Sequence, residues 1–384
     1  MKRVIQSLSK GDKRMTKGKR VLFLTNLPSP YRVKFFSRLG TECDLTVVYE
    51  RHTAADRNHK WTMKSTGTFN EIFLKGIQTG DDTSLALGIF QVLKRKFDVI
   101  VIGMYSTPTA MLAIAYLRAH HRPFIISTDG GFVAHESRLK YHLKRLLISS
   151  ASSWLSPGKF ADEYLVHYGA RAEHIHRYPF SSVERHDILT EPKSISEKKS
   201  LRLKKNILGN FVVVSVGQPI ERKGFDVLVE AFMKANIVGS SLYLIGATES
   251  EFEKVVGFKL PDNVYTVEFQ ERKDLFEFYQ AADTFVLATH EDIWGLVLNE
   301  AMANGLPVIT TDRCGAGLQL IDNGNEGFII RDGNVDDLCE ALLQSSSDAL
   351  RSRLSQNSLD KTTNQTIEEM VSSHLKVFDN VSSR

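Results

Sequence analysis

The chain is poor in cysteine and has no long apolar run. Its 384 residues include only three cysteines, Cys43, Cys314 and Cys339, which have neither the spacing of a metal site nor the even number of a disulfide set. We therefore expect free, buried thiols and a reducing compartment. No apolar segment reaches the ~20 residues of a membrane span, and the basic N-terminus lacks the apolar core of a signal peptide. These absences predict a soluble, cytoplasmic protein.

A strong charge of one sign is also missing. The formal net charge is +4, and no block of lysine and arginine is interleaved with aromatic residues as in a nucleic-acid groove. Nucleic acid is therefore not expected as a partner. Residues 1–18 precede the first predicted strand, and we expect them to be a disordered lead-in, with Met15 as an alternative natural start.

Length and periodicity predict two domains of one kind. A chain of this length with 42% apolar residues exceeds the usual size of a single core. Short β-branched runs alternate with segments of helical period, which is typical of α/β domains with a parallel sheet. The predicted parts are a Rossmann-like domain at 19–185, a linker at 186–208, a second such domain at 209–361, and a C-terminal helix at 362–384 that crosses back to the first domain. In such pairs the ligand is expected in the cleft between the domains.

One candidate binding loop follows the predicted strand 211–216. Gly217 stands at the strand end, and Arg222 and Lys223 precede Gly224, which opens the next predicted helix. Backbone can approach an anion closely at a glycine, and two cations can bind a diphosphate. The loop lacks both the Walker pattern and the dinucleotide fingerprint. A solvated basic loop therefore remains an equal alternative.

A second candidate loop lies in the stretch ATHEDIWGLVLNEAMANGLPVIT at 288–310, between a predicted strand and the predicted helix 296–304. Gly295 leaves the first amides of this helix uncovered. The N–H groups of Leu296 and Val297 at the positive end of the helix dipole can hold a phosphate. This part of the sequence therefore predicts a phosphate-binding turn.

Three acidic residues flank that turn: Glu291, Asp292 and, one turn into the helix, Glu300. Carboxylates are poor neighbours of phosphate but good acceptors for sugar hydroxyls, so the pattern favours a nucleotide sugar. Ribose is expected at Glu300, and the hexose at Glu291 or Asp292. The alternative is structural, with Glu300 on a helix surface and the other two acids capping the first turn.

From Arg20 onward the sequence resembles the retaining glycosyltransferases of family 4, which have the GT-B fold of two facing Rossmann-like domains. The second loop matches the family's E-x7-E motif, with Asp292 or the neighbouring Glu291 in the first position and Glu300 in the second. Lys223 matches the family's lysine. The family's Gly-Arg-Leu is here Gly217-Gln218-Pro219, so Arg222 is a stand-in for the missing arginine. Further resembling motifs are NLPSPYR at 26–32, SPGKF at 156–160, AADTFV at 281–286 and DNGNEGF at 322–328.

The resemblance implies transfer of a hexose from a UDP- or GDP-sugar to a glycan or lipid-linked glycan, in the synthesis of cell-surface polysaccharide, lipopolysaccharide or glycolipid. Arg222, Lys223 and the amides after Gly295 would stabilise the departing β-phosphate. Asp129 lies nearest to the family's sugar-facing histidine; as an anchor for the sugar it competes with a role as a turn-forming residue. No cofactor is implied, and since Asp-x-Asp is missing from the chain, we expect no obligatory metal.

The acceptor is expected on the first domain, where Tyr31 could stack on a sugar and Arg32 could meet a phosphate, or where both fix their loop. The segment 138–147 predicts a basic amphipathic helix. It either faces the core or rests on anionic lipid at the inner face of the membrane. Two alternatives to a transferase remain open: a UDP-sugar epimerase with the same architecture, and a catalytically silent homologue that binds sugar nucleotides.

Overall fold

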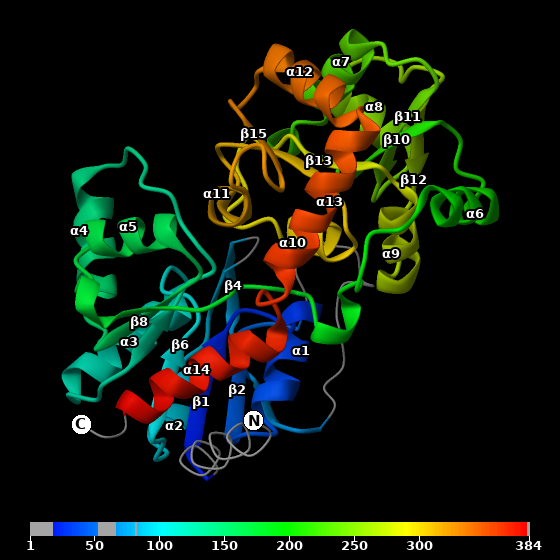
Figure 1. Cartoon of the computed structure of the whole chain (residues 1–384). Coiled ribbons are helices and arrows are strands. Elements are labelled where there is room, and N and C mark those ends of the chain that lie inside the picture. Colours follow the sequence, from blue (N-terminus) through cyan, green and yellow to red (C-terminus); the bar gives the residue numbers. More distant parts are fainter. Residues whose placement is uncertain (1–17, 53–66, 81–82, 382–384) are drawn as a thin grey trace, which may run out of the picture. The chain divides into compact units, whose positions relative to one another are not determined.

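The computed structural model describes residues 18–52, 67–80 and 83–381 (Figure 1). It divides into two compact units. The first comprises the chain up to Phe180 together with the residues from Ile367 on, and the second runs from Ser181 to Thr366. The lead-in expected at residues 1–18 lies outside the described residues, except for Gly18.

The first unit is built on a seven-stranded parallel sheet with the strand order β3-β2-β1-β6-β7-β8-β9. Its strands are β1 (Arg20–Thr25), β2 (Asp44–Tyr49), β3 (Asn70–Phe73), β6 (Val99–Ile102), β7 (Ile125–Ser127), β8 (Ser153–Ser156) and β9 (Ile175–Arg177), and β4 (Ile77–Gly80) pairs separately with β5 (Thr83–Leu85). Its helices are α1 (Pro30–Leu39), α2 (Ile89–Leu93), α3 (Pro108–Ala119), α4 (Arg138–Ile148), α5 (Lys159–His167) and α14 (Ile367–Val381), with the 3-10 turn η3 (Ala172–His174).

The second unit has a six-stranded parallel sheet in the order β12-β11-β10-β13-β14-β15, which is the Rossmann order 3-2-1-4-5-6. Its strands are β10 (Phe211–Val216), β11 (Ser240–Ile245), β12 (Val264–Val267), β13 (Thr284–Leu287), β14 (Val308–Thr311) and β15 (Gly327–Ile330). Its helices are α6 (Ile195–Lys205), α7 (Phe225–Ala235), α8 (Glu249–Val256), α9 (Arg272–Ala281), α10 (Leu296–Ala303), α11 (Gly315–Leu320), α12 (Val335–Ser345) and α13 (Asp348–Thr362), with 3-10 turns η4 (Arg185–Asp187) and η5 (Glu221–Lys223).

Burial explains why these segments form strands. All four residues of β6 and of β13 are buried, as expected where helices cover both faces of a parallel sheet. Helix starts are also set locally. The Thr107 side chain accepts a hydrogen bond from the Ala110 amide at the start of α3, and Pro108 occupies its first turn. The predicted α/β class with two Rossmann-like sheets is confirmed.

Helix α6 lies in the range 186–208 that the sequence analysis treats as a linker. Lys198 and Arg202 of α6 reach Asp283, a buried residue before β13, at 3.2 and 2.6 Å. The basic composition that suggested a solvated linker therefore includes two cations that hold α6 on the second unit. Helix α14 returns to the first unit, where it packs on α1.

Two further expectations concern the thiols and α4. Cys43, Cys314 and Cys339 are free and buried, as predicted. Helix α4 packs on the core through Leu147 and Ile148, but its other three leucines are exposed, so the core-facing alternative is wrong for most of the predicted leucine face. Within the described part of the chain, no helix has the length and hydrophobicity needed to span a bilayer.

Candidate functional site

The sheet order of the second unit places both candidate loops side by side. Strands β10 and β13 are parallel neighbours, and the strand order reverses between them. In open α/β sheets, ligands bind outside the carboxyl ends of the strands at this switch point. The loop of residues 217–224 follows β10 and the loop of residues 288–295 follows β13, so both flank the position where a ligand is expected.

Backbone bonds of Arg222 hold the two loops together. The Arg222 carbonyl oxygen accepts hydrogen bonds from the His290 amide at 2.8 Å and from the Thr289 hydroxyl at 2.7 Å. The Arg222 guanidinium donates to the Glu291 carbonyl oxygen at 3.0 Å. Gly224 completes this contact with a φ of +63°, and a Cβ atom there would collide with the Ala288 carbonyl oxygen. The loops therefore behave as one rigid rim.

Lys223 and Asp292 form the central ion pair of this rim. The Lys223 Nζ atom lies 2.6 Å from Asp292 Oδ2, and both side chains are largely buried. Asp292 Oδ1 also accepts from the Trp294 amide at 3.4 Å. The peptide N–H of Asp292 donates to the Arg313 carbonyl oxygen at 2.9 Å, which ties the residue to the end of β14. The sequence predicted both charges at a ligand site but did not predict that they pair.

Exposure separates Asp292 from its neighbour Glu291. The Asp292 side chain is 17% exposed, whereas that of Glu291 is 55% exposed and pairs with the exposed Arg313 at 3.2 Å. An exposed pair of this kind is weak and leaves Glu291 free to reorient. The fixed position of Asp292 makes it the better match for the first acid of the motif.

Gly295 begins α10 in a left-handed conformation with a φ of +95°. A Cβ atom there would lie 2.9 Å from the Cys314 sulfur, so the close packing requires glycine. No side chain caps the helix. Its first bond is from the Leu298 amide to the Gly295 carbonyl oxygen, so the amides of Leu296 and Val297 precede it. An uncapped helix start is a suitable anion site.

Two neighbours of this turn are not reactive groups. Burial, with a smaller contribution from the Asp292 charge, raises the pKa of the Cys314 thiol to about 11, so this thiol is not a nucleophile at neutral pH. Gly217 lies at the end of β10, where a Cβ atom would meet Phe225 at 3.5 Å and Lys223 at 3.8 Å. Those are ordinary contact distances. Gly217 is therefore not required by the space around it in this structure.

Glu300 of α10 lies in a polar network within the second unit. Its Oε1 atom accepts from the Ser182 hydroxyl at 2.8 Å and from Arg272 at 3.3 Å. Arg272 also pairs with Asp187 at 2.6 Å. The alternative of Glu300 as a plain surface residue is wrong, since its side chain is mostly buried.

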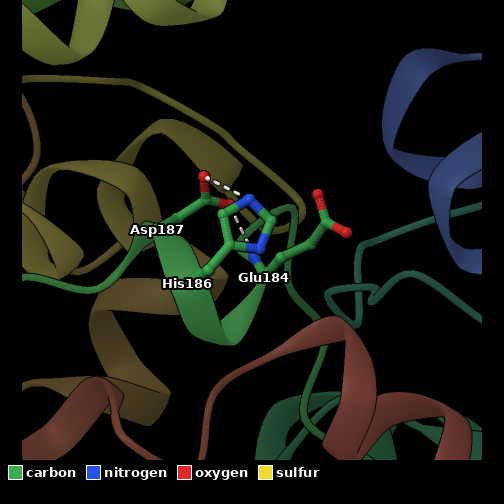
Figure 2. A group of neighbouring side chains, drawn as sticks. All are labelled: Glu184, His186 and Asp187. Carbon is green, nitrogen blue, oxygen red and sulfur yellow. Dashed lines mark hydrogen bonds and ion pairs between the residues drawn. The ribbon is translucent and has the colours of Figure 1, made fainter.

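A possible cation cluster lies beside this network. Glu184, His186 and Asp187 can each offer one ligand atom, and these atoms lie within 4.8 Å of one another (Figure 2). The two carboxylates already form the capping box of η4, and Asp187 is paired with Arg272. His186 is exposed. We assign the cluster a structural role in holding Arg272.

The first unit contains the remaining candidate, Asp129, after the end of β7. Asp129 Oδ1 lies 2.6 Å from the Arg32 guanidinium, and the Tyr31 hydroxyl donates to Oδ2 at 3.2 Å. Burial lowers the pKa of Arg32, but Asp129, Tyr31 and Tyr178 together outweigh burial, and the pKa lies above its usual value. Arg32 and Tyr31 therefore fix the strand-end loops. About one third of the Asp129 side chain stays exposed.

Ser182, Arg272 and Arg313 contact the candidate site residues without having been predicted from the sequence. Ser182 and Glu300 are 118 positions apart, and Arg272 and Glu300 are 28 apart. No local motif connects them, so no sequence signal could have found these contacts. Lys223, Arg222, Asp292, Glu291 and Gly295 do lie together on two adjoining loops.

The second unit is similar in sequence to a known protein family and to proteins of bacterial polysaccharide synthesis. Residues 197–361 match the family "Glycosyl transferases group 1". The match covers less than half of the chain. It is 29% identical over 176 residues to the capsular polysaccharide biosynthesis glycosyltransferase CapM of Staphylococcus aureus, covering 44% of this chain and 46% of CapM. It is also 29% identical over 164 residues to the lipopolysaccharide core biosynthesis glycosyltransferase LpsE of Rhizobium meliloti, covering 42% of this chain and 47% of LpsE. The chain thus spans less than half the length of these relatives.

The whole architecture resembles solved structures. The Anabaena protein HepE, crystallised in complex with UDP and glucose, matches with a TM-score of 0.73 at 16% identity, covering 95% of this chain and 100% of HepE. At this identity the likeness establishes the fold alone. The fold is GT-B, as the resemblance implied.

Proposed function

We propose that this chain is a group 1 glycosyltransferase and, more specifically, a retaining enzyme of the family 4 type. It moves a hexose from a UDP- or GDP-sugar to a glycan or lipid-linked glycan, in the synthesis of cell-surface polysaccharide or glycolipid. The relatives that act in capsular polysaccharide and lipopolysaccharide core biosynthesis support this context, and HepE with UDP and glucose supports the class of donor.

The Lys223–Asp292 pair at the switch point carries this proposal. A cation held by a carboxylate at 2.6 Å is already positioned and desolvated. A donor diphosphate can then share the Lys223 ammonium with Asp292, while hydroxyls of the sugar donate to the Asp292 carboxylate. The pair therefore accounts for both halves of a nucleotide sugar, which a solvated basic loop would not.

In the proposed reaction, the bond from the anomeric carbon to the diphosphate oxygen breaks as the acceptor oxygen bonds to that carbon on the same face. The acceptor proton passes to the departing diphosphate. Lys223, Arg222 and the amides of Gly295, Leu296 and Val297 stabilise the negative charge that develops on the β-phosphate. Removing one such group typically costs about 3 kcal/mol of barrier.

The other assignments in this proposal are sugar contacts. Glu300, positioned by Ser182 and Arg272, binds the ribose hydroxyls, and Gly217 lets the donor approach the end of β10. Asp292, rather than Glu291, contacts the hexose. Asp129 anchors the transferred sugar from the first unit. No cofactor and no metal ion takes part, because the chain lacks an Asp-x-Asp motif.

A two-step experiment tests the proposal. Thermal shift with UDP, GDP, ADP and the corresponding sugar nucleotides identifies the donor, and release of free nucleoside diphosphate is then measured with and without oligosaccharide acceptors. A transferase releases diphosphate, and acceptor accelerates the release. An epimerase would interconvert the sugar nucleotide without net release. A silent homologue would show the thermal shift with no release, which would contradict the proposal.

A further inference from the structure

Helix α4 exposes an apolar stripe. Leu139, Leu143 and Leu146 are 81%, 42% and 50% exposed. Spaced at i, i+4 and i+7, they share one face of the helix. Single exposed leucines are common on protein surfaces, but three aligned on one helix face form a continuous apolar strip. This strip needs a partner that the described structure does not supply.

The opposite face of α4 packs on the rest of the first unit. Tyr141 packs on Tyr168 with ring centroids 5.6 Å apart, and Ile148 is buried. Lys144 pairs with Glu136 at 2.8 Å and lies 4.9 Å from the centre of the Tyr168 ring. These contacts fix the rotation of α4. The three leucines are consequently presented outward by a rigid support, and Lys144 is turned toward the protein.

Cations flank the leucine stripe on both sides. Arg138 and Lys140 at the start of α4, and Arg145 near its end, are exposed. The helix sequence RLKYHLKRLLI contains no acidic residue. An apolar strip bordered by positive charge is the pattern of a helix that lies in the plane of a membrane interface, with its cations at anionic headgroups.

A second copy of this chain fits the surface poorly. In a two-fold symmetric contact the same patch faces itself, so the α4 cations of one copy would oppose those of the other without acidic partners on the helix. Such like-charge contacts disfavour association. The charge pattern instead complements an anionic surface.

We propose that α4 docks the protein onto an anionic lipid bilayer through Leu139, Leu143 and Leu146, with Arg138, Lys140 and Arg145 at the headgroups. The inference does not depend on the proposed transfer reaction, because docking is measured without substrate. If both hold, the first unit meets lipid-linked acceptors at the membrane surface.

Co-sedimentation of the full chain with vesicles tests the docking. The vesicles consist of phosphatidylcholine alone or mixed with phosphatidylglycerol. Binding is expected only to the anionic vesicles and should weaken as salt rises. Leu139→Ser/Leu143→Ser should lower partitioning at least about tenfold. Arg138→Glu/Lys140→Glu should lower partitioning by more than about 25-fold, because each cation removed costs roughly fivefold and the variant removes two.

Matched control variants carry the same changes on exposed residues elsewhere. Ile195→Ser/Leu203→Ser removes two exposed apolar side chains from α6, and Lys199→Glu/Lys254→Glu reverses two exposed lysines. These controls should bind vesicles as the wild type does, and all variants should melt cooperatively near the wild-type temperature.

Three results would overturn the proposal. The wild type could fail to bind anionic vesicles at low salt, or the α4 variants could bind as well as the controls. In the third, sedimentation velocity would show a dimer that the leucine variants dissociate, with no vesicle binding, which would identify a second copy as the occupant.

Discussion

The variant Lys223→Ala separates the proposed role of Lys223 in turnover from its contribution to stability. We expect Lys223→Ala to lower the rate of donor turnover by about 100-fold, because one cation that stabilises the departing diphosphate is lost. Because both side chains are largely buried, the loss of this pair leaves Asp292 without its cation and should also lower the melting temperature, while unfolding stays cooperative. Steady-state kinetics and thermal melting measure the two effects.

Lys254→Ala is the control for that experiment, because Lys254 is an exposed lysine on α8 in the same unit. It should leave turnover and melting unchanged. If Lys223→Ala abolished cooperative melting to the same extent as turnover, Lys223 would be a structural residue and the proposed phosphate role would be lost.

Conservative variants of Asp292 and Glu291 should differ in their effect on donor affinity. Asp292→Asn should weaken donor affinity at least about tenfold, because it removes the charge paired with Lys223 and a sugar contact. Glu291→Gln should change affinity less than about threefold, because this side chain is exposed and its ion pair is with the exposed Arg313. Isothermal titration with the donor identified by thermal shift compares them. The reverse order would give Glu291 the first acidic position.

At the scale of the element, Asp283 holds α6 on the second unit. This buried carboxylate pairs with Lys198 and Arg202 of α6, and with Arg351 at 3.6 Å. Removing one partner of a buried ion pair leaves the others uncompensated. We expect Asp283→Asn to lower the free energy of unfolding of this unit by about 3–5 kcal/mol, measured by urea denaturation.

The exposed Lys234–Asp336 pair between α7 and α12 provides the control for Asp283. Asp336→Asn should cost less than about 1 kcal/mol. Equal losses in the two variants would show that burial of Asp283 is not what makes its ion pairs important.

At the scale of the whole molecule, helix α14 follows the second unit in the sequence but packs in the first unit, where His374 is one of its buried residues. Its ring is buried against Phe35 and Tyr178, and its Nδ1 atom bonds the Met370 carbonyl oxygen at 2.7 Å. Burial lowers the pKa of His374 to about 4 from an ordinary value of 6.5. The folded state therefore resists protonation, and the stability contributed above pH 6.5 is lost as the pH falls through 4.

His374→Phe should remove this acid sensitivity while keeping an aromatic ring in place. We expect the free energy of unfolding of the wild type to fall more steeply than that of the variant between pH 7 and pH 4. Denaturant unfolding at several pH values measures both slopes. Parallel slopes would show that His374 does not set the acid limit, and the exposed His120→Phe is the matched control.

The sequence by itself determined the two parallel sheets and the segment ends that build the site. Short apolar runs such as 211–216 and 284–287 predict strands covered on both faces, and Gly217, Gly224 and Gly295 mark the loops that follow them. Both signals are local, because an apolar run and a turn-forming glycine involve only residues that are neighbours in the sequence. Hence the placement of Lys223, Asp292 and Gly295 at one edge could be predicted.

Only the tertiary structure decided which charges meet and which faces are covered. The pairing of Lys223 with Asp292, of Glu300 with Arg272, and of α6 with Asp283 joins residues 28 to 85 positions apart. Likewise, the leucines of α4 could face a core or a membrane until the packing of Tyr141 and Lys144 fixed the rotation of the helix. A helical period specifies a face but not its neighbour, because the neighbour depends on how distant segments pack.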